Sequence, residues 1–486
     1  MVNWLLIYEI FYVLVVTLVC IRIIWDTSAN AKALAYMLFV IFVPILGIFV
    51  YFSFGVNYRK RKLYRKKIIS DNILAEKIRT DLYKEAKRAF KEGGKMMEEN
   101  KELAVMLMND NKSPLTINND VKLLVNGENK FPEVLNAIKE AKHHIHMEYY
   151  IYEDDEIGKK VEEALIEKAK EGVIVRFIYD DFGSHSIRKH LVPRLKKGGV
   201  QTSPFYKVHF WAFANRINYR NHRKIIVVDG VIGFVGGINV SDRYINAKSS
   251  HKKLFWRDTH LRIQGSGVHY LQYLFLNDWN FCAGDCLTGD EAYFPKLKTL
   301  PVYGNKIVQI AASGPDSETP SVLYSMVEVI YQASKEILIT TPYFVPGESI
   351  LDAILIAALG GVSVKLLVPD KADSKFVNAA ARSYYAELLA AGVEIYLYKK
   401  GFIHAKTLAA DQKISIVGTA NIDYRSFDLN FEVNAIVYDH QIAKELSDVF
   451  YDDLKHAKKI DAKAWNNRPV ITQFFERTAR LMSPLL

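Results

Sequence analysis

The spacing of hydrophobic and polar positions changes along this chain of 486 residues. From about residue 116 onward, short apolar runs rich in β-branched residues alternate with longer segments whose apolar positions recur at helical spacing. The first pattern is typical of buried strands and the second of amphipathic helices. Their alternation predicts an α/β protein with helices on both faces of a sheet.

The same succession of elements occurs twice in this region. Strands are expected at residues 145–151, 173–179, 337–341 and 362–368. Helices are expected at residues 132–142, 157–171, 186–197, 348–359 and 374–391. Glycine, proline and polar residues gather near residues 285–305, and we expect the boundary between two halves there.

Two apolar segments precede the α/β region. Residues 4–25 are apolar apart from Glu9 and Arg22, and residues 33–55 carry no charge. At about 1.5 Å per residue, each could cross a hydrocarbon core of roughly 30 Å. The pattern predicts a two-helix transmembrane hairpin over residues 1–57, with shallow insertion of the first segment or a buried soluble hairpin as alternatives. The start lacks the positive region of a signal peptide.

A strongly basic run follows the apolar segments, with seven Lys or Arg among residues 59–67. Such a run beside a membrane segment favours the cytoplasmic side and should bind anionic head groups. Residues 66–108 have helical periodicity and many charges, interrupted by glycines. We expect residues 58–115 to form a helical connector, which could lie on the membrane or present a solvated face.

One short motif occurs in both halves. Residues 222–229 read HRKIIVVD and residues 404–411 read HAKTLAAD, so both copies have the form H-x-K-x4-D. An asparagine lies 17 positions after each histidine, preceded by a glycine three positions earlier. Agreement of five residues at fixed spacing indicates an internal duplication that produces two half-sites of one kind.

The motif places His222 beside Lys224 and His404 beside Lys406, because residues two apart on a strand point to the same face. An imidazole can act as a nucleophile or as a proton donor near neutral pH. An ammonium group can neutralise phosphoryl oxygens. Two facing pairs could therefore attack a phosphodiester and protonate its leaving group with no metal and no other cofactor.

The doubled motif resembles the signature of the phospholipase D superfamily. Within that superfamily the chain resembles bacterial cardiolipin synthases over nearly its whole length. The stretches that carry the resemblance are VPILGIFVYFSFG, SPLTINNDVKLLVNG, HIHMEYYIYEDDEIG, HRKIIVVDGVIGFVGGIN, HAKTLAADQKISIVGTANIDYRS and the terminal RLMSPLL. The resemblance implies two duplicated α/β domains with the active site between them, expected over residues 116–295 and 296–486.

The resemblance also implies a reaction and its partners. One motif histidine would attack the phosphorus of phosphatidylglycerol while the other protonates the departing glycerol. A second phosphatidylglycerol would then displace the histidine and give cardiolipin. The resemblance favours His222 as the nucleophile and His404 as the acid and then the base. The enzyme would lie in the cell membrane with its catalytic part on the cytoplasmic side.

Four further residues complete the predicted site. Asn239 and Asn421 follow the two motifs and would cradle the phosphoryl oxygens together with the lysines. Asp258 and Glu432 lie on strands expected beside the motif strands and would orient the imidazoles. Glu432 follows the second motif, so we expect it to hold His404.

The motif aspartates, Asp229 and Asp411, belong to the predicted catalytic set as members of the motif. They lie at the far ends of their strands, however, and a role in a turn or an ion pair fits that position better. Ser426 is a weaker site candidate.

Three segments have a functional and an ordinary interpretation. Residues 207–221 form an aromatic and basic insert that could line a lipid entrance with Arg216 or Arg220 near phosphate, or pack as a loop. His143, His144 and His146 cluster on an expected strand, where packing is favoured over metal binding. The chain has three cysteines, too few for a disulfide framework, and the close pair Cys282 and Cys286 predicts no metal site.

The formal net charge of +10 favours a polyanionic partner, either nucleic acid or an anionic membrane. A phospholipase D hydrolase, a membrane-anchored nuclease and a non-catalytic scaffold are the alternatives. The expected hairpin argues against the nuclease, so no nucleic acid partner is expected, and two intact motifs argue against the scaffold. The sequence leaves open transfer against hydrolysis, the acceptor lipid and the oligomeric state, and a homo-oligomer is compatible with it.

Overall fold

The computed structural model describes residues 4–27, 30–52, 84–110, 113–206, 219–246, 254–285, 287, 292–296 and 300–481. The predictions for the basic run at residues 59–67 and for residues 207–218 of the insert fall outside these ranges.

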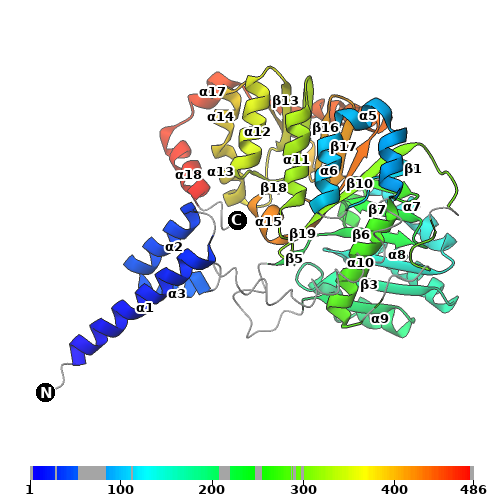
Figure 1. The fold of residues 1–486 in the computed structure, drawn as a ribbon, viewed down its shortest axis with the longest axis horizontal. Coiled ribbons are helices and arrows are strands. Elements are labelled where there is room, and N and C mark those ends of the chain that lie inside the picture. The colour runs from blue at the N-terminus through cyan, green and yellow to red at the C-terminus, as the bar shows by residue number, and fades with distance from the viewer. Residues whose placement is uncertain are drawn as a thin grey trace.

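One sheet of 16 strands runs through both halves (Figure 1). The first half contributes, in spatial order, β4 (Gln201–Phe205), β3 (Ile174–Asp180), β2 (His144–Tyr149), β6 (Lys224–Val228), β7 (Ile232–Gly236), β9 (Thr259–Gln264) and β1 (Thr116–Val125). The second half continues with β10 (Lys306–Ser313), β19 (Asn430–Tyr438), β17 (Ile414–Gly418), β16 (Thr407–Ala410), β11 (Glu336–Thr340), β13 (Ser363–Pro369), β14 (Glu394–Tyr398) and β20 (Ala457–Lys459). From the antiparallel β1–β10 pair outward, the first seven strands of each half correspond, so the duplication extends far beyond the motif.

Each motif strand has the same neighbours in both halves. β6 lies antiparallel to β2 and β7, and β16 lies antiparallel to β11 and β17. Outside them, β2, β3 and β4 are parallel, as are β11, β13 and β14. Parallel neighbours need crossover connections, and helices supply them here.

Helices cover both faces of the sheet, as the alternating pattern predicted. Those of the first half are α7 (Asn126–Glu140), α8 (Glu156–Lys170), α9 (Leu191–Lys197) and α10 (Val268–Ala283). Those of the second are α11 (Ser321–Gln332), α12 (Glu348–Leu359), α13 (Lys375–Ser383), α14 (Tyr385–Ala390), α15 (Tyr424–Asp428), α16 (His440–Leu454), α17 (Ala462–Asn466) and α18 (Val470–Leu481). Two expected helices are shorter or divided: only residues 191–197 of the segment 186–197 are α-helical, and α13 and α14 meet at Tyr384.

The two halves share one hydrophobic core. A single cluster of buried side chains joins α10 and α16 to strands of both halves, for example Ile225 of the first and Ala409 of the second. Of the remaining two large clusters, one lies in the first half, and the other lies mainly in the second half and includes Ile117 of β1. Because the central core crosses the β1–β10 boundary, the halves form one packed body.

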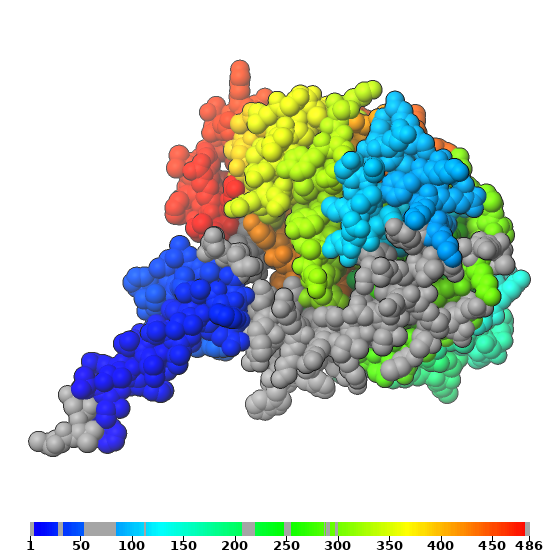
Figure 2. Space-filling model, in the orientation of Figure 1, coloured from blue at the N-terminus to red at the C-terminus, as the bar shows by residue number. Residues whose placement is uncertain are grey.

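The N-terminal helix α1 (Trp4–Asp26) is long and apolar enough to span a membrane. Its 23 residues correspond to about 35 Å, against roughly 30 Å for a hydrocarbon core. Its large apolar side chains are nearly all exposed, and with α2 (Asn30–Phe42) and α3 (Pro44–Val50) it projects from the body as a separate lobe (Figure 2).

The second apolar segment does not form the single transmembrane helix expected over residues 33–55. The helix ends at Phe42, and a second, short helix begins at Pro44. Proline lacks the N–H that would continue the helix, and its ring clashes with the preceding turn. A Cβ on Gly47 would lie 2.5 Å from the carbonyl oxygen of Phe39, so glycine allows the two short helices to approach closely.

The expected connector is partly a component of the core. Helices α5 (Gly94–Glu99) and α6 (Lys101–Asp110) pack on the second half, with Leu103 and Leu107 buried in its hydrophobic cluster. Gln309 on β10 donates hydrogen bonds to the carbonyl oxygens of Ala104 and Ser113. This segment is therefore neither a free linker nor, at α6, a membrane-surface helix.

Candidate active site

The two motif histidines are each paired with a carboxylate from the other half. His222 Nδ1 lies 3.1 Å from Glu432 Oε1, and His404 Nδ1 lies 2.6 Å from Asp258 Oδ2. The structure therefore brings together the predicted histidines and both predicted orienting acids. The expectation that Glu432 holds His404 is wrong, because Glu432 pairs with His222.

Each histidine pairs with a carboxylate of the other half because short strands pair across the boundary between the halves. β5 (Arg220–Asn221) pairs in parallel with β19 of the second half, and β15 (Gly401–Ile403) pairs in parallel with β8 (Phe255–Arg257) of the first. The His222 N–H then donates to the carbonyl of Phe431 at 3.0 Å, and the His404 N–H donates to that of Arg257 at 2.7 Å. Each histidine is thus fixed beside the residue that precedes its carboxylate.

Glu432 is itself held by several groups. Thr419 Oγ1 donates to one carboxylate oxygen, and Asn430 Nδ2 donates to the other at 3.3 Å. Burial alone would raise the pKa of Glu432, but His222 and Lys224 hold this pKa below its ordinary value. An ionised carboxylate favours a proton on the facing Nδ1 of His222 and leaves Nε2 available for chemistry.

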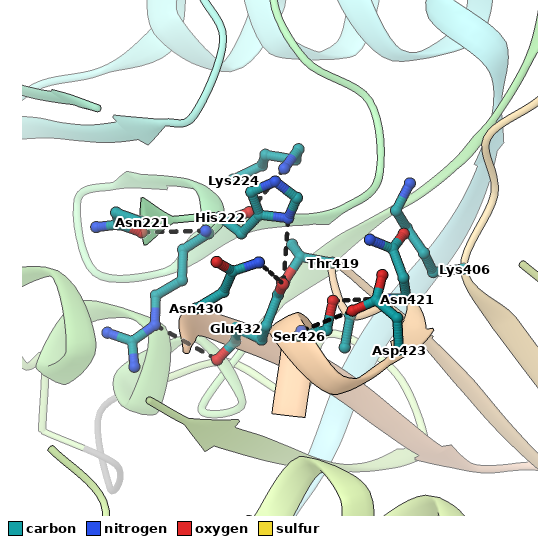
Figure 3. A network of polar contacts seen from close by, with 12 residues as sticks. Asn221, His222, Lys224, Lys406, Thr419, Asn421, Asp423, Ser426, Asn430 and Glu432 are labelled. Carbon is teal, nitrogen blue, oxygen red and sulfur yellow. Dashed lines mark hydrogen bonds and ion pairs between the residues drawn. The ribbon is translucent and has the colours of Figure 1, made fainter. Parts of the chain in front are cut away.

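The motif lysines lie at the same site, as the strand alternation predicted. Lys224 Nζ donates to the carbonyl of His222 at 2.7 Å, and Lys406 Nζ donates to that of His404. Figure 3 shows His222 and Lys224 of the first half beside Glu432, Asn421 and Lys406 of the second. The candidate site therefore lies where the halves meet.

Burial strongly changes the proton affinities of these cations. It lowers the pKa of Lys224 to about 8 and that of Lys406 to about 7, with the neighbouring Lys224 adding to the effect on Lys406. Burial also lowers the pKa of His222 and of His404 to about 4. Both imidazoles are thus neutral near pH 7, and an entering phosphate anion would favour their protonation.

The predicted asparagines have different environments. Asn239 accepts the N–H of Ile151 at 3.2 Å and donates to the hydroxyl of Tyr244 at 2.8 Å. The backbone N–H of Asn421 donates to Ser426 Oγ at 3.2 Å, but the buried Oδ1 of Asn421 has no hydrogen-bond partner among the described residues. Ser426 is therefore in contact with the site through Asn421.

The motif aspartates lie at the opposite ends of the motif strands from the histidines. Asp229 accepts three consecutive backbone N–H groups, of residues 142–144, at 2.8–2.9 Å. Asp411 accepts the equivalent three, of residues 334–336, at 2.8 Å. Both contacts fix the chain that leads into a neighbouring strand, which supports the interpretation that these aspartates serve the fold.

Each half of the chain separately matches the same protein family. Residues 134–266 and 326–454 each match the family described as cardiolipin synthase, PLD-like domain. The chain is 41% identical to the major cardiolipin synthase of Bacillus subtilis (strain 168) over 483 residues, which cover 98% of both chains. It is 43% identical to a cardiolipin synthase of Geobacillus sp. (strain WCH70) over 444 residues, covering 91% of this chain and 86% of that one. This chain belongs to the cardiolipin synthase family.

A solved structure resembles the fold of this cardiolipin synthase family member. The crystal structure of phosphatidylserine synthase from Haemophilus influenzae Rd KW20 matches with a TM-score of 0.56 and 15% identity. The match covers 75% of this chain and 95% of that one. At this identity the likeness concerns the fold alone.

Aromatic side chains that sequence reasoning missed enclose both histidines. The ring of Tyr150 lies 4.2 Å from that of His222, and the rings of Trp256 and Tyr244 lie 5.5 and 5.9 Å from that of His404. The duplication contained a signal for Tyr244, because it follows Asn239 by the same five positions that separate Ser426 from Asn421. These rings remove the site from water, which contributes to the lowered pKa values.

A buried ion pair also supports the first half-site. Arg223, which lies between His222 and Lys224 in the first motif, contacts Asp278 at 2.5 Å. Burial and this neighbouring Asp278 raise the pKa of Glu148 well above its usual value. Sequence reasoning did not identify these residues because α10, which carries Asp278, is distant in the chain.

His144 and His146 of the histidine cluster pack in the interior, as expected, whereas His143 is exposed. His144 Nε2 lies 2.9 Å from Gln272 Oε1, and His146 Nε2 lies 3.1 Å from Arg176 NH1. Within the described part of the chain, no group of three or more His, Cys, Asp or Glu could hold a metal ion. The Cys282 thiol donates to the carbonyl of Asp278 at 2.7 Å, and Cys286 lies outside the described residues.

Proposed function

We propose that this protein is a phosphatidyltransferase that converts two molecules of phosphatidylglycerol into cardiolipin and glycerol. The observation that carries the proposal is the symmetric pair of histidines, each held by a carboxylate of the other half. Family membership over nearly the full length supports the same reaction.

The first step forms a covalent intermediate. His222 Nε2 attacks the phosphorus of the first phosphatidylglycerol, and the bond to the glycerol head group breaks. His404, protonated in the complex, donates its proton from Nε2 to the departing glycerol oxygen. Glu432 stabilises the positive charge on the phosphorylated His222, and Asp258 holds His404 in the orientation for proton transfer.

The second step regenerates the enzyme. His404 Nε2 accepts the proton of a terminal hydroxyl of the second phosphatidylglycerol, whose oxygen attacks phosphorus as the bond to His222 breaks. One phosphodiester replaces another, so the reaction needs no energy donor. Lys224 and Lys406 stabilise the charge on the phosphoryl oxygens, together with Asn421.

Two groups of predicted site residues have other roles in this proposal. Asp229 and Asp411 organise the fold and take no part in the chemistry. Asn239 positions Tyr244 near His404 and contacts phosphate less directly than Asn421, because its amide already binds protein groups.

The proposed reaction takes place at a membrane. Helix α1 would anchor the enzyme in the bilayer, and the basic run at residues 59–67 supports a catalytic part on the cytoplasmic side. Phosphatidylglycerol is then the proposed partner, and a homo-oligomer is compatible with this arrangement.

The direct test is to incubate the purified protein with phosphatidylglycerol alone, without nucleotide or added metal. We expect cardiolipin and an equal amount of glycerol. Phosphatidic acid as the sole lipid product would assign the protein to hydrolysis instead. Loss of turnover in chelator that one metal restores would contradict the metal-free proposal.

A further inference from the structure

Arg220 is a buried cation with unused hydrogen-bond donors beside the candidate site. Its exposed fraction is only 3%, and neither NH1 nor NH2 has a hydrogen-bond partner among the described residues. Its guanidinium group stacks on the ring of Phe182 at 4.6 Å. Buried donors without partners cost free energy, so this group is suited to a ligand.

The nearby carboxylate does not use these donors. Asp180 accepts the backbone N–H groups of Phe182, Gly183 and Asn221, at 2.8–3.1 Å. It remains close enough to attract the Arg220 charge. The charge of Arg220 is thus partly neutralised by Asp180, whereas its NH1 and NH2 groups have no hydrogen-bond partner among the described residues.

Arg220 also lies next to the reacting centre. It precedes His222 by two residues, and β5 places it opposite Asn430 on β19 of the second half. Arg425 of the second half lies within electrostatic reach of both Arg220 and Tyr150, the ring that contacts His222. The buried guanidinium group of Arg220 therefore lies at the junction of the two halves, beside the residues that carry His222.

Comparison of the two halves shows that only the first half has an arginine two residues before its motif histidine. The position equivalent to Arg220 in the second half is Phe402, a buried apolar ring. The two half-sites are alike in their histidines and lysines but differ at this flanking position.

We propose that Arg220 binds the phosphodiester of the second lipid, the acceptor. This proposal rests on the proposed function. The acceptor carries its own phosphate, three carbons from the hydroxyl that attacks, so a second anion site is needed only when the acceptor is a phospholipid. A guanidinium group binds phosphate oxygens through two parallel hydrogen bonds, and Arg220 has the matching donors unused.

The test compares a charged and a neutral acceptor with the same donor lipid. Cardiolipin formation from phosphatidylglycerol uses the charged acceptor, whereas exchange of the phosphatidylglycerol head group with labelled glycerol uses a neutral one. We expect Arg220→Gln to lower cardiolipin formation at least about tenfold more than it lowers glycerol exchange, because charge-assisted hydrogen bonds to the acceptor are lost. Arg220→Lys should recover part of the loss.

Lys444→Gln is the matched control, since it removes one positive charge from an exposed site on α16. It should leave the ratio of the two rates unchanged. Equal losses in both reactions for Arg220→Gln, or no loss in either, would overturn the acceptor site. Wild-type protein that exchanges glycerol but makes no cardiolipin would refute the proposed function itself, and the acceptor site with it.

A second inference rests on the C-terminal helix. Helix α18 is attached to the body through its charged face: Glu476 is buried and forms ion pairs with Arg382 at 3.0 Å and with Arg468 at 2.8 Å. Arg480 pairs with Glu387 at 2.8 Å. The helix therefore presents the opposite face outward.

That outward face is apolar. Phe474 and Phe475 are 62% and 64% exposed, and Val470, Ile471 and Leu481 are exposed on the same side. A helix that buries Glu476 and exposes its large apolar side chains is the reverse of an ordinary surface helix. Figure 1 shows α18 on the side of the molecule from which α1–α3 project.

We infer that the outer face of α18 lies in the bilayer interface and forms a second membrane contact beside α1. Helix α18 packs on α13, which in turn contacts β12 (Phe344–Val345). β12 pairs with β18 (Ile422–Asp423), which directly follows Asn421 of the site. A membrane contact at α18 would thus hold the site at a fixed position relative to the lipid surface.

The test places an environment-sensitive fluorophore on Phe475→Cys in full-length protein whose other cysteines are serine, reconstituted into phosphatidylglycerol-containing vesicles. Nitroxide-labelled lipid should quench this probe several-fold more than a probe on Lys444→Cys, and aqueous iodide should do the reverse. Quenching equal to that of the control would overturn the inference. If the probe is protected from iodide only when a vesicle holds several copies of the protein, a second copy of the chain covers the face. This result would also overturn the inference.

Discussion

Glu432 and Asp258 each lie beside the Nδ1 atom of one motif imidazole, where they can fix its tautomer and orientation. Neither carboxylate belongs to the same half as its histidine. A histidine whose orienting acid is lost can adopt the wrong tautomer or rotate away from the phosphate. At the scale of residues, the account therefore predicts that these carboxylates matter more than the aspartates of the motif itself.

We expect Glu432→Gln to lower kcat by roughly two to four orders of magnitude, the range seen when an orienting carboxylate is replaced. Asp411→Asn should mainly lower the free energy of unfolding, by about 1–2 kcal/mol, because it weakens contacts to three backbone N–H groups. Turnover and urea denaturation of both variants check this contrast. Wild-type kcat in a folded Glu432→Gln variant would refute the orienting role.

The buried lysines predict the pH dependence of the free enzyme. Lys406 and Lys224, with pKa values near 7 and 8, are charged below these values and lose their charge as the pH rises through them. The value of kcat/KM should therefore fall on the alkaline side from about pH 7. Arginine keeps its charge at every pH in the profile, so in Lys406→Arg the alkaline fall of kcat/KM should move to higher pH. An unchanged alkaline fall would contradict its assignment to Lys406.

At the scale of elements, the loop after β7 shapes the site through Gly237. A Cβ on Gly237 would lie 2.2 Å from Asp258 Oδ1, so a methyl group there must displace the carboxylate that holds His404. We expect Gly237→Ala to lower kcat at least about tenfold, beyond its effect on stability. Gly347→Ala is the control, because its nearest neighbour would be 3.5 Å away; similar kcat values for the two variants would argue against this coupling.

The elements also show what the sequence could and could not predict. The duplicated motif identified His222, Lys224, His404 and Lys406, because a fixed spacing on a strand determines which residues share a face. The exchange of carboxylates was not predictable, since it arises from β5 and β15, strands of two and three residues that pair across the halves.

Other failures have local causes. Hydropathy favoured one span over residues 33–55, but the chain breaks at Pro44, whose effect composition averages conceal. The many charges of residues 66–108 concealed the few apolar positions through which α6 joins the core. Arg220 stood out in sequence only as one basic residue of an insert, and its lack of partners required the fold.

At the scale of the whole molecule, the two halves form one body with a shared core and a shared site. Each half supplies one histidine, one lysine and the carboxylate for the other half's histidine. Neither half alone could therefore complete a catalytic histidine. The lobe of α1–α3 would keep this site at the membrane where its proposed substrate is located.

The proposed orientation in the membrane is testable with one introduced cysteine. Lys160→Cys on α8, in a background without other cysteines, should resist a membrane-impermeant thiol reagent in intact cells and react after permeabilisation. Lys160 is exposed and lies in the catalytic body, so its labelling reports the side of the membrane. Labelling in intact cells would place the site outside the cytoplasm.

The central claim is a two-step transfer through a histidine held from the opposite half. The most direct measurement is to quench turnover with phosphatidylglycerol labelled in its phosphate and to map the labelled peptide. The account predicts phosphohistidine at His222, and trapped label that decreases in Glu432→Gln. Label at His404 with none at His222 would reverse the roles of the two histidines, and the absence of any phosphohistidine, with inversion at phosphorus, would contradict the mechanism.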